Sequence, residues 1–115
     1  MLPFSPYTMV SRTQYLLGKF AEEAVEVSQR AMKAQLFGLD DSQEGHADNY
    51  TRLKEEFNDF LGVVEELGLE VPGKFGRDLV DSTQVEAKRL KLRKYEACAG
   101  NLGNLGYLQQ PTTPT

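Results

Sequence analysis

Two stretches of the chain place an apolar residue at every third or fourth position, and this pattern constrains the fold more than any other feature. The first set is Leu16, Phe20, Ala24, Val27 and Ala31, and the second is Leu53, Phe57, Phe60, Val64 and Leu67. Such spacing collects each set into one stripe along an α-helix. The sequence therefore predicts two amphipathic helices that pack through these stripes.

Polar residues mark the ends of both helices. Ser11 with Gln14 predicts a capped start for the first helix, which we expect to run to about Lys33. Residues 38–48 are rich in turn formers and acids and predict a polar loop. Asp48 or Asn49 then caps the second helix, which we expect to end before Gly68.

A third helix is predicted after a break in the chain. Pro72, Gly73 and Gly76 interrupt the helical pattern, and the next helix begins near Asp78 or Ser82. It carries Val85, Leu92 and Tyr95 in a less regular stripe. We expect a domain over residues 1–100 and a turn-rich, disordered tail over residues 101–115. The predicted fold class is all-α, with about three main helices per chain.

Length and composition narrow the function classes. A chain of 115 residues fits one domain, but a few long helices leave apolar faces uncovered. The net charge of −4 argues against binding duplex nucleic acid. Cys98 is alone, so no intramolecular disulfide can form, and no stretch approaches the ~20 apolar residues that span a bilayer. We expect a cytoplasmic protein without a membrane partner.

Four acids carry the predicted chemistry. Glu23 and Glu26 are three residues apart on the first helix, as are Glu56 and Asp59 on the second. At ~100° per residue, each pair lies roughly 60° and 120° to the same side of its stripe. Antiparallel packing would bring the four carboxylates to one edge of the interface, where they repel unless protonated or neutralised. Oxygen ligands without thiols or paired imidazoles favour Mg²⁺, and Mn²⁺ can substitute.

A simpler reading of the acids stays open. Glu is a good helix former, and acids three residues apart are common on solvated helix faces. The competing function is a non-enzymatic helical interaction or regulatory protein with an acidic face. The matched phase of the two pairs favours the metal site.

Two segments resemble a known family. Residues 19–30, KFAEEAVEVSQR, and residues 53–61, LKEEFNDFL, resemble the EExxE and ExxD signature of the MazG-like family in the all-α NTP pyrophosphohydrolase superfamily. The matching residues are Glu22, Glu23, Glu26, Glu56 and Asp59. Residues 88–95, KRLKLRKY, resemble the basic, Tyr-containing third helix of related small proteins. The resemblance covers roughly residues 10–100, and the loop over residues 38–49 and the C-terminal segment depart from it.

The resemblance implies an enzyme that hydrolyses a nucleoside triphosphate between its α and β phosphates, giving a monophosphate and pyrophosphate. It also implies a homodimer or homotetramer, in which a partner subunit completes a four-helix core.

Roles for individual residues follow as a hypothesis. Mg²⁺ would be bound by Glu23, Glu26, Glu56 and Asp59, and the predicted catalytic residues are Glu22, Glu23 and Glu56. Glu22 serves as a further ligand or as a base that orients the attacking water. Lys91 and Lys94 contact phosphates, although a Lys and Arg run is commonly a solvated face. Tyr95 stacks on the base or fills the core.

Overall fold

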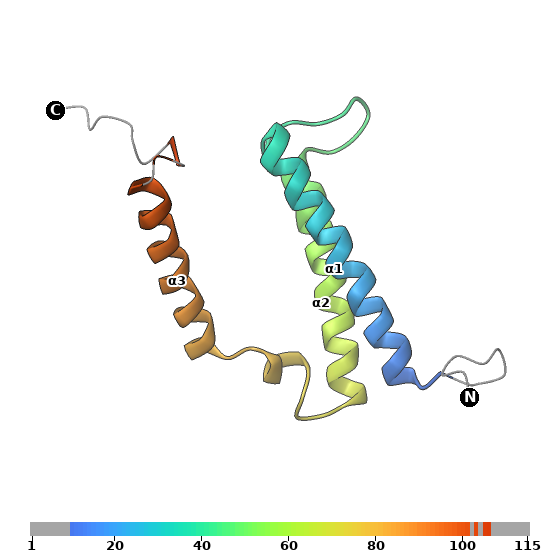
Figure 1. Cartoon of the computed structure of the whole chain (residues 1–115). Helices are drawn as coiled ribbons and strands as arrows, with labels where there is room; N and C mark the ends of the chain where they lie inside the picture. Colours follow the sequence, from blue (N-terminus) through green and yellow to red (C-terminus); the bar gives the residue numbers. More distant parts are fainter. Residues whose placement is uncertain (1–9, 102, 104, 107–115) are drawn as a thin grey trace, which may run out of the picture. The chain divides into compact units, whose positions relative to one another are not determined.

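The computed structural model describes residues 10–101, 103, 105 and 106, and within them every regular element is helical. The elements are α1 (Arg12–Phe37), α2 (Asn49–Glu70), a short 3₁₀ helix η1 (Gly76–Leu79) and α3 (Ser82–Asn101) (Figure 1). The prediction of an all-α chain with three main helices is confirmed. Within the described part of the chain, none of these helices combines the length and apolar character needed to cross a membrane.

The start of α1 is fixed by the predicted capping box. The Ser11 hydroxyl accepts a hydrogen bond from the Gln14 backbone N–H at 3.1 Å, and the Gln14 side chain accepts one from the Ser11 N–H at 2.9 Å. The helix continues past the predicted end at Lys33 to Phe37. It ends at Gly38, whose φ of 96° breaks the helix while its N–H still donates to the Ala34 carbonyl at 2.8 Å.

The loop between α1 and α2 is polar, as predicted, and it is tied at both ends. Asp48 caps α2 by accepting a hydrogen bond from the Thr51 N–H at 2.7 Å. The side chain of Asn49 is buried and donates to the Gly38 carbonyl at 2.9 Å, and the Tyr50 N–H donates to the Leu39 carbonyl at 2.9 Å. These bonds hold the end of α1 beside the start of α2.

The predicted end of α2 was wrong, because Gly68 lies inside the helix. The helix runs to Glu70, and Gly68 serves a packing role. A Cβ at position 68 would lie 3.2 Å from the Gly76 Cα, which is tighter than nine in ten real Cβ contacts. Glycine therefore lets η1 pack against α2 without a shift of the η1 backbone.

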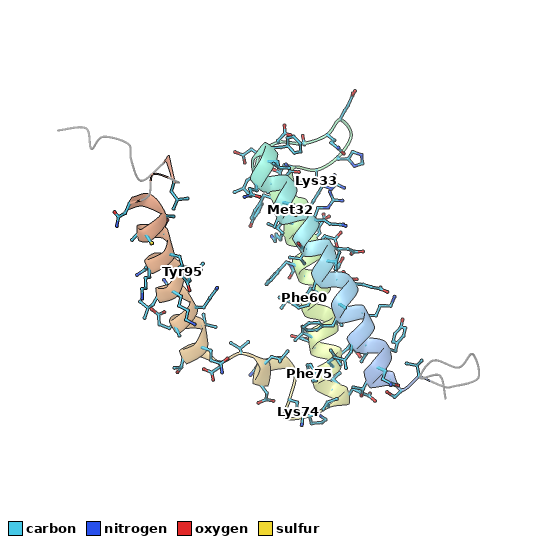
Figure 2. The ribbon with its side chains drawn as sticks, in the orientation of Figure 1. Met32, Lys33, Phe60, Lys74, Phe75 and Tyr95 are labelled. Atoms are coloured by element: carbon cyan, nitrogen blue, oxygen red, sulfur yellow. The ribbon has the colours of Figure 1, made fainter. Side chains whose placement is uncertain are left out.

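The helices α1 and α2 pack side by side and antiparallel (Figure 1). At one end, Arg12 forms ion pairs with Glu66 at 2.8 Å and Glu70 at 3.0 Å. Midway, the rings of Phe20 and Phe60 meet edge to face with centroids 4.7 Å apart; Figure 2 labels Phe60. We call this pair of helices the α1–α2 hairpin.

The core of the hairpin is small. The buried apolar residues are Leu16, Val64 and Leu67. Two members of the predicted stripes, Ala31 and Phe57, are exposed, and Phe57 keeps 48% of its surface. Each predicted stripe is thus only partly covered by the residues that the structure describes.

The chain divides into two compact units, one ending at Leu79 and the other beginning at Val80. The second contains α3, which begins where predicted because the Asp81 side chain accepts a hydrogen bond from the Gln84 N–H at 3.0 Å. No described residue of α3 is buried. The predicted tail over residues 101–115 lies mostly outside the described residues.

Candidate metal centre

Three carboxylates from the two helices of the hairpin converge. One oxygen each from Glu23 on α1 and from Glu56 and Asp59 on α2 lie within 4.8 Å of one another. Oxygens that share a cation at ~2.0–2.6 Å can be at most about 5 Å apart, so this separation suits a single ion. The antiparallel packing of α1 and α2 produces the convergence, because both acid pairs flank their stripes on the same side.

Two of these carboxylates have buried oxygens without hydrogen-bond partners. Glu23 and Glu56 are half-buried, and in the described part of the chain the Oε2 atom of each has no partner; Asp59 is exposed. A buried carboxylate oxygen without a donor is unfavourable and calls for a cation or a proton. These orphaned oxygens are the strongest sign that the cluster accommodates a ligand.

The electrostatics of the cluster agree with its geometry. Burial raises the pKa of Glu23, and the neighbouring charges of Glu26 and Asp59 raise it further. The pKa of Glu56 is raised first by burial, then by hydrogen bonding with Glu26 and by the charges of Glu26 and Asp59. Both shifts favour the protonated acids when no cation is bound.

Glu26 belongs to the same edge although it is outside the set of three oxygens. It is exposed, yet its carboxylate lies close enough to raise the pKa of both Glu23 and Glu56. The structure thus brings together the four acids that the sequence pairs as Glu23 with Glu26 and Glu56 with Asp59. Their assignment as metal ligands stays a prediction.

Glu22 occupies a different position from the cluster. It is exposed, and its carboxylate accepts a hydrogen bond from the Lys19 ammonium at 3.2 Å. Lys19 also lies 5.6 Å from the centroid of the Tyr15 ring. Glu22 is therefore an exposed carboxylate that is paired with Lys19 and adjacent in sequence to Glu23. Its catalytic role stays a prediction.

The predicted substrate contacts lie on α3, in the second unit. Lys91, Lys94 and Tyr95 are all exposed, and Tyr95, labelled in Figure 2, keeps 65% of its surface. Tyr95 therefore does not fill a core within the second unit, as far as the structure describes that unit. Cys98 is exposed as well.

Two arginines near the cluster were missed by the sequence reasoning. Arg30 on α1 is half-buried, and its Nη1 atom is buried without a hydrogen-bond partner among the described residues. Arg52 on α2 is also half-buried. Their spacing from the acids, four residues from Glu26 and from Glu56, was the signal that could have found them.

Comparison with known proteins does not identify a family for this chain, so the resemblance to the MazG-like family rests on the acid signature. No family model, curated protein or solved structure matches the chain.

Proposed function

We propose that this protein is a Mg²⁺-dependent nucleoside triphosphate pyrophosphohydrolase of the MazG-like type. It would cleave the α–β phosphoanhydride to give a nucleoside or deoxynucleoside monophosphate and pyrophosphate. The observation that carries the proposal is the meeting of Glu23, Glu56 and Asp59 oxygens within 4.8 Å, with two carboxylate oxygens buried and unpartnered.

The donor set fits a hard divalent cation. All the converging atoms are carboxylate oxygens, which suit Mg²⁺ or Mn²⁺ better than softer metals. When bound at such a site, the metal lowers the pKa of a coordinated water and neutralises charge on the phosphates. Without a cation, burial and mutual repulsion disfavour the ionised carboxylates.

The side chains of the hairpin would divide the work. Glu23, Glu26, Glu56 and Asp59 hold the cation, and their two helices fix their separation. Glu22, beside Glu23, would orient the attacking water and accept its proton, with Lys19 holding the carboxylate in place.

The exposed lysines of α3 carry the positive charge that a nucleotide's phosphates would require. Lys91 and Lys94 are free to contact phosphates, and the exposed ring of Tyr95 is free to stack on a base.

A second copy of the chain would cover an uncharged face of α1. A face of this helix away from the acids carries no charged residue; it includes Leu17, Ala21, Val25, Ser28, Met32 and Leu36. Val25 and Met32 are 56% and 58% exposed, and Phe57 and Leu61 extend the apolar surface onto α2. A homodimer or homotetramer would bury this surface in a four-helix core.

We place the protein in the cytoplasm, where a free cysteine such as Cys98 stays reduced.

The test is pyrophosphate release from ribo- and deoxynucleoside triphosphates, with Mg²⁺ or with a chelator. The wild type should release pyrophosphate only with Mg²⁺, and Glu56→Gln should lower turnover by at least about 100-fold because a ligand is lost. Glu55→Gln is the matched control, since Glu55 is the exposed neighbour on the same helix. No release from any nucleotide, or full turnover by Glu56→Gln, would show the proposal to be wrong.

The exposed apolar surface also supports a second candidate, a non-enzymatic interaction or regulatory protein. Such a protein would bind a partner through this surface and gain no stability from Mg²⁺. The metal dependence of stability therefore separates the two candidates.

A further inference from the structure

Two arginines lie at equal sequence distances from the acids of their own helices, in opposite directions along the chain. On α1, Arg30 follows Glu26 by four residues and Glu23 by seven; on α2, Arg52 precedes Glu56 by four residues and Asp59 by seven. The matching is meaningful because the helices run antiparallel. A step toward the C-terminus on α1 and a step toward the N-terminus on α2 both lead to the end of the hairpin that carries the 38–48 loop.

Helix geometry places both arginines on the acidic edge. At ~100° and ~1.5 Å per residue, each arginine lies within roughly 40° of the acids of its own helix and about 6 Å along the axis from the nearer one. Both side chains are half-buried. The edge thus changes sign along its length, from four carboxylates to two guanidinium groups.

Neither guanidinium is neutralised within the described part of the chain. Three other cations there form ion pairs: Arg12 with Glu66 and Glu70, Lys19 with Glu22, and Arg89 with Glu86. Arg30 and Arg52 have no ion pair, and the buried Nη1 of Arg30 has no acceptor and is shielded from solvent. A buried guanidinium N–H without an acceptor is unfavourable, so an anionic ligand would relieve it.

We infer that Arg30 and Arg52 form a phosphate subsite beside the carboxylate cluster. The inference rests on the proposed function, in which the carboxylates hold a cation that binds part of a polyphosphate. The planar guanidinium groups would bind the adjoining phosphate, for which their paired N–H donors are well shaped. The subsite selects ligands whose polyphosphate reaches both the cation and the arginines, so triphosphates bind in preference to monophosphates.

The experiment measures binding of inorganic tripolyphosphate to the full chain in Mg²⁺ by calorimetry. Arg30→Gln and Arg52→Gln should each weaken binding about tenfold or more, because each removes a charge-assisted contact. Lys54→Gln is the matched control, as Lys54 is exposed, two residues from Arg52, and on the opposite side of α2. It should bind as the wild type does. Binding of Mn²⁺ alone should not weaken in any variant, since none of these side chains is a proposed ligand.

The outcomes separate the two ideas. Wild-type pyrophosphate release and Mn²⁺ binding report on the proposed function, and their absence would overturn it. If both are present and the arginine variants bind tripolyphosphate as tightly as Lys54→Gln, the phosphate subsite alone is wrong. Should a Gln variant lose helicity, Arg30→Lys and Arg52→Lys decide the matter. Weaker binding supports guanidinium contacts, and wild-type affinity in both overturns them.

Discussion

The α1–α2 hairpin and α3 form helices equally well but differ in charge and burial. Up to Leu79 the chain carries eight Lys and Arg against fourteen Asp and Glu, a net charge of −6; from Val80 it carries five against three, a net charge of +2. Every buried residue of the described chain lies in the hairpin, and α3 has none. Local signals are therefore enough to make a helix, whereas burial requires a partner helix in phase.

The ion pairs show the same difference. Arg12 connects the start of α1 to the end of α2 and so fixes how the two helices are aligned. In α3 the described pair is Arg89 with Glu86, three residues apart on one helix, which supports the helix but positions nothing else. The carboxylates of the hairpin therefore come from two helices with a defined alignment, whereas the apolar residues of α3 are exposed.

The largest expected effect tests where the stabilising burial lies. Leu67 is fully buried, so Leu67→Ala should lower the free energy of unfolding by about 2–5 kcal/mol. Leu92 on α3 is 54% exposed, so Leu92→Ala should cost less than about 1 kcal/mol. Urea denaturation of the two variants measures both values. Equal losses would show that α3 is packed in solution and would remove the contrast.

Mg²⁺ should stabilise the hairpin specifically. At a concentration 100 times its Kd, a cation that binds only the folded chain stabilises it by about 2.7 kcal/mol. Thermal unfolding followed by circular dichroism, with Mg²⁺ and with chelator, measures the gain. Glu56→Gln should abolish it and Glu55→Gln should keep it. A wild type that melts identically in both conditions would favour the interaction-protein candidate.

The raised pKa values predict a smaller dependence on pH without metal. Because the folded-state pKa values of Glu23 and Glu56 lie above those of the unfolded chain, folding favours their protonated forms. That contribution is complete below the unfolded pKa and is lost as the pH rises through the folded pKa values. In chelator, stability should therefore fall from acidic toward neutral pH. Glu23→Gln should flatten the profile, and an unchanged profile would contradict the burial of this carboxylate.

The sequence predicts the features that depend on residues close together in the chain or on helical phase. The Ser11 and Gln14 box and the Asp48 cap involve partners three residues apart, and each was confirmed. The meeting of Glu23 with Glu56 and Asp59 followed from phase, because both acid pairs flank their stripes on one side.

Other features depend on contacts that no local pattern encodes. Gly68 looks like a helix stop in sequence, but its role is set by the approach of Gly76 after the chain has turned back. The burial of the Arg30 Nη1 atom depends on how the side chains around it pack in the folded chain, so spacing alone could only suggest it. Filling the core was one of the two roles predicted for Tyr95, because it extends an apolar stripe, yet a stripe is buried only where another element covers it.

The smallest expected effect compares the helix caps of the two units. Ser11→Ala removes the acceptor for the Gln14 N–H and should lower the free energy of unfolding by about 1 kcal/mol, because α1 and α2 unfold together. Asp81→Ala removes the matching acceptor for the Gln84 N–H. It should fray the start of α3 and leave the main unfolding transition almost unchanged.

Denaturation reports the first loss, and amide hydrogen exchange at the start of α3 reports the second. Gln29→Ala, at an exposed position within α1, is the control and should not destabilise the chain, since Ala is the better helix former. If Asp81→Ala lowers the free energy of unfolding as much as Ser11→Ala, the hairpin and α3 unfold as one cooperative unit. The charge and burial that distinguish them would then describe two parts of a single folding domain.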